Sequence, residues 1–175
     1  MNDEEIVAAT RARQLESKRI FAPASSVEIA AAEKRLGFPF VTLLRRLLED
    51  VGNGVLLPEG SLLGIPSAGE ANRDIDGRTM LDLRGAMAAD GMDGVVLRHA
   101  VPLCDLGCAQ WLWLDCDMGA DGTVLTMADE AIYRTDLTLR TWWMAALENR
   151  MLEVLFEEGS SRIGIDHVRS VRSVR

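Results

Sequence analysis

The sequence predicts an α+β domain, because helical patterns occupy both ends of the chain and strand patterns cluster in the middle. Helical spacing of apolar residues dominates the first 50 residues and returns after residue 139. Between residues 95 and 133, short segments rich in strand-forming residues alternate with turn residues. The strand–helix alternation of a nucleotide-binding parallel sheet is missing.

The N-terminal region predicts two helices. Residues 3–18 form the first, with a weak apolar stripe of Ile6, Ala9, Arg13 and Leu15. The second begins at Ser25, which precedes Glu28 by three residues. This is the capping-box spacing, in which the two side chains satisfy free backbone N–H groups reciprocally. Gly37 should end this helix.

A further helix is expected over residues 40–50, with Val41, Leu44, Leu47 and Leu48 on one face. Gly52-Asn53-Gly54 should end it, since these residues tolerate positive φ angles. Residues 55–77 then predict short extended pieces and turns, and Met80–Ala89 predicts another helix.

The central block predicts four strands, and one long helix should close the fold. The strands are Val95–Leu103, Cys108–Cys116, Thr123–Met127 and Ala131–Tyr133, and the helix is Leu139–Glu157. We expect one domain over residues 21–158, an N-terminal helical extension over 1–20 and a basic, mobile tail over 159–175.

Charge is unevenly distributed. Residues 1–48 carry a net +2, residues 49–158 a net −13 and residues 159–175 a net +3. An acidic body argues against nucleic acid as the ligand and favours a basic protein partner, although acidity also serves solubility. No uncharged run approaches the roughly 18 residues of a membrane span, and the acidic N-terminus does not resemble a secretory signal. We therefore expect a cytoplasmic protein without membrane contact.

No catalytic motif is found, and we expect neither an enzyme nor a cofactor. Neither His99 nor His167 has a partner suggested by spacing. Cys108 and Cys116 lie about 26 Å apart if the segment between them is a strand, too far for one metal ion. Packed thiols are therefore predicted, and the series Asp115, Asp117, Gly119 and Asp121 departs from a calcium loop at two positions.

The predicted strand Cys108–Cys116 carries the candidate binding residues. Alternation places Trp111, Trp113, Asp115 and Asp117 on one face. Tryptophan is enriched at binding hot spots and carboxylates add specificity, so this face is a candidate protein-binding site. The alternative is that the closing helix covers the face and buries both rings. The other acidic residues assigned to this candidate site are Glu70, Asp74, Asp76, Asp105 and Asp121.

Two segments resemble the SUKH superfamily, which includes bacterial immunity proteins and the Smi/Knr-type regulators. The first is Val27–Pro39 with the Leu-Gly helix stop, followed by a second helix and Gly52-Asn53-Gly54. The second runs from Val101-Pro102-Leu103-Cys104-Asp105 through Leu114-Asp115-Cys116 to Val124. Phe38, between the Leu-Gly stop and Pro39, and Leu106, where an aromatic residue is common, depart from the family pattern.

The resemblance implies helices packed on a curved, mainly antiparallel sheet and a non-enzymatic role. That role is to bind a cognate toxin, often a nuclease, and to neutralise it. An acidic inhibitor would suit a target with a basic surface. The superfamily also implies an alternative, a regulatory or scaffolding module that binds proteins.

Overall fold

The computed structural model describes residues 1–17, 20–57, 60–89, 98–107, 110–128, 131–156 and 166–168. Its helices are α1 (Asp3–Leu15), α2 (Ser26–Leu36), α3 (Thr42–Arg46), the π-helical turn η1 (Leu47–Val51), α4 (Met80–Ala89), α5 (Leu139–Leu147) and α6 (Met151–Phe156). Its strands are β1 (Val55–Leu57), β2 (Gly60–Leu62), β3 (Ala100–Gly107), β4 (Gln110–Asp115), β5 (Thr123–Ala128), β6 (Ala131–Thr138) and β7 (Asp166–Val168).

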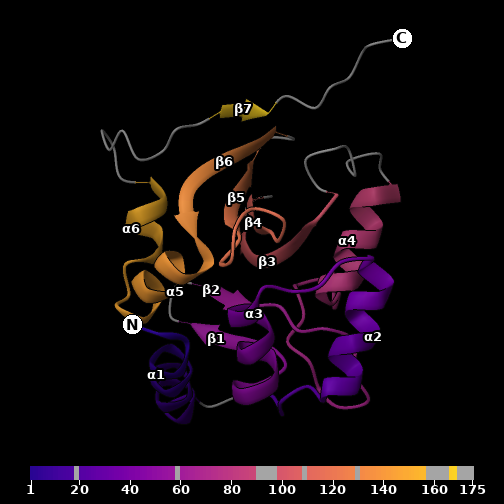
Figure 1. The fold of residues 1–175 in the computed structure, drawn as a ribbon, viewed down its shortest axis with the longest axis vertical. Coiled ribbons are helices and arrows are strands. Elements are labelled where there is room, and N and C mark those ends of the chain that lie inside the picture. Colours follow the sequence, from indigo (N-terminus) through magenta and orange to yellow (C-terminus); the bar gives the residue numbers. More distant parts are fainter. Residues whose placement is uncertain are drawn as a thin grey trace.

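An antiparallel sheet in the order β3-β4-β5-β6-β7 forms the centre of the fold, and β1 and β2 form a separate hairpin. In Figure 1, α1, α5 and α6 lie on one side of the sheet and α2 and α4 on the other. The hairpin joins the sheet where the Leu63 N–H donates to the Leu103 carbonyl at 2.8 Å. The prediction of an α+β fold with an antiparallel sheet is confirmed.

The predicted capping box of α2 is present. The Ser25 hydroxyl accepts from the Glu28 N–H, and the Glu28 carboxylate accepts from the Ser25 N–H at 2.8 Å. Glu28 also accepts from the Ala68 N–H at 2.9 Å, so the helix start holds a loop 40 residues away. The hydrogen bonds from Ser25 and then from Ala68 lower the pKa of Glu28.

Replacing Glu28 by glutamine should therefore destabilise the protein in a pH-dependent way. A lowered folded-state pKa means that the ionised carboxylate stabilises the fold above its usual value of 4.5, and that this contribution is lost as the pH falls. We expect Glu28→Gln to lower the free energy of unfolding by about 1 kcal/mol at pH 7. Urea melts should show the gap between variant and wild type closing below pH 4.5, and a constant gap would contradict the prediction.

The predicted glycine-rich helix stop has a buried polar clamp at its centre. Asn53 is buried, and its side-chain amide bonds both backbone groups of Ile65: the Ile65 N–H donates to Oδ1 at 2.8 Å and the Ile65 carbonyl accepts from Nδ2 at 2.9 Å. The Asn53 carbonyl accepts from the Asn72 N–H at 2.8 Å. Gly54 has a φ of 108°, which only glycine adopts readily. Asn53 thus ties the end of η1 to two points of the β2–α4 loop, Ile65 and Asn72.

Helix α1 packs into the same core as the sheet, through Ile6 and Val7. The Trp143 indole N–H of α5 donates to the Thr10 hydroxyl at 2.9 Å, with both groups buried. The predicted apolar stripe was wrong at Leu15, which is 74% exposed, because the buried face of the helix includes Thr10 and Gln14 in place of a purely apolar row.

The predicted closing helix is two helices. The helix is interrupted between α5 and α6 at Asn149, which has a φ of 59°. Arg150 N–H donates to the Ala145 carbonyl and Asn149 N–H to the Ala146 carbonyl, which is the Schellman pattern of a helix end. Asparagine tolerates the left-handed conformation that this helix end requires. The apolar pattern continues on both sides of Asn149, which is why periodicity alone predicted a single helix.

The strand boundaries also differ from those predicted. β3 begins at Ala100 rather than at residue 95, and β6 extends to Thr138. Residues 95–97, Cys108 and most of the tail 159–175 lie outside the described residues. No helix in the described ranges is long and apolar enough to cross a membrane.

Candidate functional site

The end of β4 and the β4–β5 loop carry three of the predicted acidic residues, and each is directed to a different partner. The nearly buried Asp115 carboxylate accepts from the Asp117 N–H at 3.1 Å and lies 3.7 Å from the Arg134 guanidinium. The exposed Asp117 carboxylate lies 3.4 Å from Nδ1 of His99. These contacts hold the loop and direct its carboxylates apart.

Asp121 is bound by Arg140 of α5. Nε and Nη2 of Arg140 each donate to the Asp121 carboxylate at 2.9 Å, and Nη2 also donates to Asp3 of α1 at 2.6 Å. The hydrogen bonds that Arg140 donates to Asp121 and then to Asp3 raise the pKa of Arg140. This ion triad joins the start of α1 to the sheet.

The loop carboxylates do not converge as calcium ligands would. No group of three or more His, Cys, Asp or Glu side chains suited to a metal ion occurs in the part of the chain that the structure describes. The charges of Asp115 and Asp121 are already opposed by Arg134 and Arg140.

Trp113 belongs to the core. It is fully buried, and its cross-strand neighbours Pro102 and Leu125 are buried as well. The alternative of a buried ring therefore holds for this residue, and a partner could not reach it without unfolding the sheet. Trp111, two residues earlier in β4, is only half-buried.

Trp111 and Asp105 are directly opposite each other on β4 and β3. Opposed residues of an antiparallel pair share one face, with Cβ atoms about 5 Å apart. The Asp105 carboxylate accepts from the Gly107 N–H at 2.8 Å, which fixes it at the strand end. A partly exposed aromatic ring beside a positioned carboxylate has the composition of a binding hot spot.

The β2–α4 loop carries the remaining predicted acids, and Asp74 is its structural centre. The Asp74 side chain is fully buried. Its carboxylate accepts from the backbone N–H groups of Asp76 and Arg78 and from the Arg78 guanidinium, at 3.1, 2.6 and 2.7 Å. Asp74 therefore positions the loop, whereas Glu70 and Asp76 are exposed.

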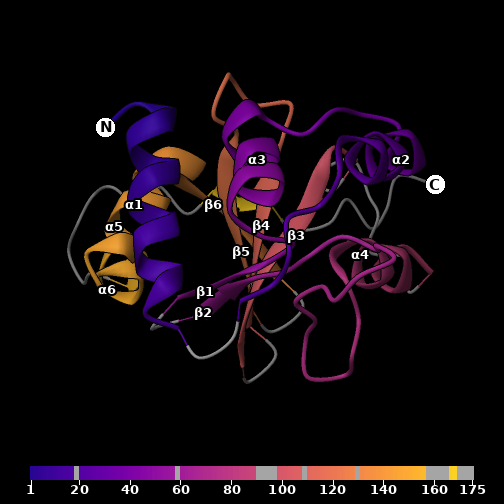
Figure 2. The same cartoon turned by 90° about the horizontal axis from the view of Figure 1, so that it is seen from below.

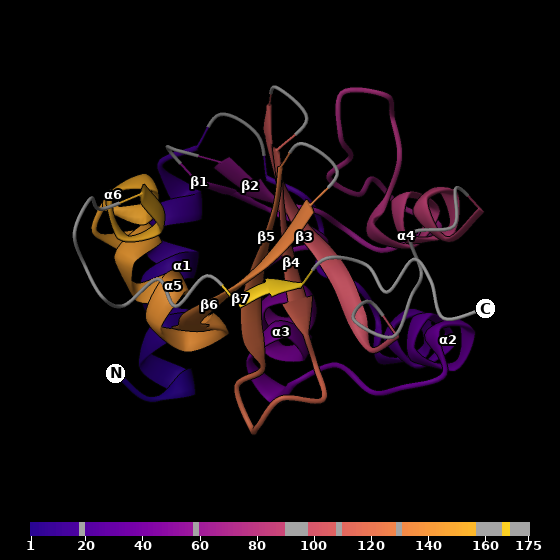
Figure 3. The same ribbon diagram turned by 90° about the horizontal axis from the view of Figure 1, so that it is seen from above.

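The candidate residues divide into two groups at opposite ends of the sheet. Asp105 and Trp111 pair near one end of the β3–β4 hairpin, and Asp115 pairs with Ala100 at the other. Figures 2 and 3 show the β2–α4 loop projecting toward the end of the sheet at which β3 ends and β4 begins. The β4–β5 loop lies at the opposite end. We name four members of the first group the turn-side surface: the exposed Glu70 and Asp76 and the half-buried Asp105 and Trp111.

Sequence reasoning missed Ile75, which lies between Asp74 and Asp76 and is 91% exposed. A lone isoleucine in an otherwise polar loop, Asn72-Arg73-Asp74-Ile75-Asp76-Gly77, is the signal that could have found it.

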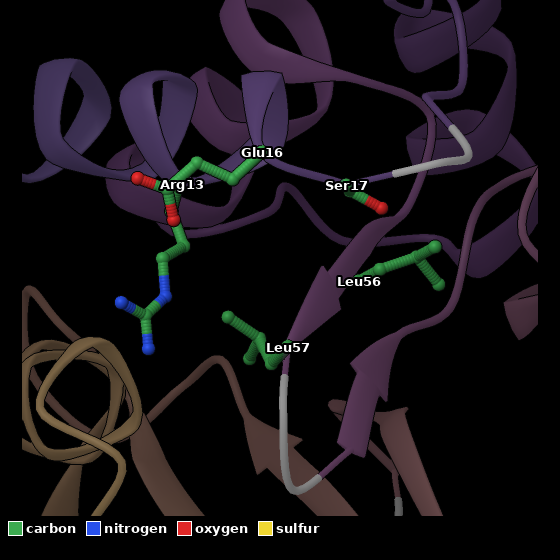
Figure 4. A pocket seen from close by; sticks show the side chains of 5 residues that line it. All are labelled: Arg13, Glu16, Ser17, Leu56 and Leu57. Atoms are coloured by element: carbon green, nitrogen blue, oxygen red, sulfur yellow. The ribbon is translucent and has the colours of Figure 1, made fainter.

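A hollow of about 430 Å³ lies elsewhere, between the end of α1 and β1. Figure 4 shows the side chains that line it: Arg13, Glu16, Ser17, Leu56 and Leu57. Arg13 is also hydrogen-bonded to Asn149. None of the predicted candidate residues lines this hollow.

Two cysteines are packed thiols in the structure. Burial raises the pKa of Cys104 and of Cys116 to about 12. Because the thiolate is the reactive form, neither should react at neutral pH. In a Cys108→Ser background, iodoacetamide at pH 8 should leave the folded protein unlabelled and label two thiols after denaturation in urea, as counted by intact mass. Rapid labelling of the native protein would contradict the assignment.

The fold is an α+β domain with helices on both sides of an antiparallel sheet. The aromatic and acidic side chains near the end of the β3–β4 hairpin form a candidate surface for protein recognition. The SMI1 / KNR4 family (SUKH-1) matches residues 23–142, and the chain belongs to this family. The family assignment agrees with the resemblance found in the sequence. No curated protein and no solved structure matches the chain significantly. Helix α1 precedes the matched residues and α6 follows them.

Proposed function

We propose that the chain is a non-enzymatic immunity protein that binds a cognate bacterial toxin domain and neutralises it in the cytoplasm. Membership of the SUKH-1 family carries the proposal, because the superfamily resemblance implies this role. The net charge of −13 over residues 49–158 supports a partner with a basic surface. The toxin's activity, which we expect to be that of a nuclease, is part of the same proposal.

We place the partner on the turn-side surface rather than on the β4–β5 loop. Asp115 and Asp121 already face Arg134 and Arg140, so a partner's cations would have to compete with ion pairs that exist. Glu70 is exposed, and Trp111 is half-buried beside Asp105. These groups can meet a basic partner without first breaking the ion pairs of the β4–β5 loop.

Co-expression with the product of the neighbouring gene tests the proposal. We expect rescue of growth and a one-to-one complex that weakens with added salt, since exposed charge pairs are screened. Charge reversal by Glu70→Lys should weaken the complex several-fold. Glu16→Lys, an equal charge change on the far side of the sheet, should not. Absence of both rescue and complex would refute the proposal.

The SMI1 / KNR4 match also supports the second candidate, a regulatory or scaffolding module. Such a module should bind several cellular proteins weakly and should give no protection from a toxin. The same co-expression experiment separates the two, because only the immunity protein rescues growth.

A further inference from the structure

Residues 73–78 of the β2–α4 loop form a hydrogen-bonded platform that displays one apolar side chain. Asp74 accepts three hydrogen bonds from within the loop. The Asp74 N–H donates to the Arg78 carbonyl at 3.0 Å, and the Gly77 N–H donates to the Asp74 carbonyl at 3.0 Å. Arg73 closes the loop from the other side by donating to the Gly77 carbonyl at 2.8 Å.

This platform exposes the Ile75 side chain to solvent. At 91% exposure, Ile75 is the most exposed of the large apolar residues in the described ranges, ahead of Val27 at 76% and Leu15 at 74%. Single exposed apolar residues are common on protein surfaces. Val27 and Leu15, however, are carried by regular helices, whereas Ile75 is held out by a loop whose conformation depends on a buried carboxylate.

A preorganised apolar side chain has the properties of a binding anchor. Since the loop is already ordered, little conformational entropy is lost when Ile75 enters a pocket, and the free energy of its burial contributes to affinity. Residues 70–78 hold three carboxylates and two guanidinium groups, and Arg78 is shared between Asp74 and Asp76. The anchor is therefore bordered by a small excess of negative charge.

We propose that Ile75 is the apolar anchor of the turn-side surface and inserts into a pocket of the partner protein that is bordered by lysine or arginine. The inference rests on the proposed function, because it names the contact by which the same partner is held. It adds an apolar contact to a surface whose other members are mainly acidic.

The test is calorimetric titration of the inactivated product of the neighbouring gene with three forms of the full chain. These are the wild type, Ile75→Ala and the control Leu15→Asp, which changes an exposed apolar residue of α1 on the far side of the sheet. Ile75→Ala should bind about tenfold more weakly, with an unchanged melting temperature because the side chain has no packing to lose. Leu15→Asp should bind like the wild type.

Ile75→Asp separates the apolar contact from the charge. An apolar pocket excludes the added carboxylate, because burying a charge costs free energy, so Ile75→Asp should bind at least as weakly as Ile75→Ala. A purely electrostatic contact with a basic partner would instead be strengthened by the added carboxylate. If the wild type binds and both Ile75 variants stay within twofold of it, the anchor is refuted while the proposed function stands. If Leu15→Asp weakens binding equally, Ile75 has no special role. If the wild type binds nothing, the proposed function fails, and the anchor fails with it.

Discussion

Gly64→Ala should lower the free energy of unfolding by about 3 kcal/mol, among the largest effects of any single methyl group added to this protein. A Cβ at this position would lie 2.4 Å from the Asn53 carbonyl oxygen and 2.9 Å from Cβ of Ala71. The backbone is held in place, because the Gly64 N–H donates to the Asn72 carbonyl and the Gly64 carbonyl accepts from the Met80 N–H. The methyl group would therefore displace Asn53 from its clamp on Ile65.

Gly69→Ala is the matched control. A Cβ there meets nothing within 4 Å, and the residue lies in the same β2–α4 loop. Its free energy of unfolding should stay within about 1 kcal/mol of wild type. Chemical denaturation of the two variants under identical conditions measures the difference. Equal stabilities would show that the loop is not fixed around Asn53 as described.

A chain that begins at residue 20, and so lacks α1, should lose about 5 kcal/mol or more of stability. The deletion removes the buried Ile6 and Val7, each of which contributes roughly 1.5–3 kcal/mol. It also leaves the Trp143 indole N–H without its acceptor, Thr10. Because whole domains are stable by only about 5–15 kcal/mol, we expect the truncated chain to be partly or wholly unfolded at 37 °C.

Circular dichroism and the cooperativity of thermal unfolding measure this outcome. Thr10→Val isolates one contact, since it removes the hydroxyl and keeps the shape; it should destabilise by about 1–3 kcal/mol. Cooperative unfolding of the truncated chain at the wild-type midpoint would show that the residues matched by the family do not need α1.

The sequence determined the local structure wherever one short-range signal dominated. The Ser25–Glu28 capping box and the Gly37 stop define α2 from within residues 25–37, because both act through neighbouring backbone groups. The same holds for α4, whose bounds match the predicted Met80–Ala89. Where a local signal competed with periodicity, as at Asn149, the apolar pattern alone predicted one helix in place of two.

The candidate site was determined only by the tertiary structure. Alternation placed Trp111, Trp113, Asp115 and Asp117 on one face of a strand, but it could not say which of them is covered or already paired. Burial of Trp113 and the pairing of Asp115 with Arg134 depend on elements distant in the sequence. Exposure and charge pairing are properties of the packed chain, since they arise from neighbours that folding alone brings together. Ile75 shows the same point, because its exposure depends on a carboxylate that only the folded loop buries.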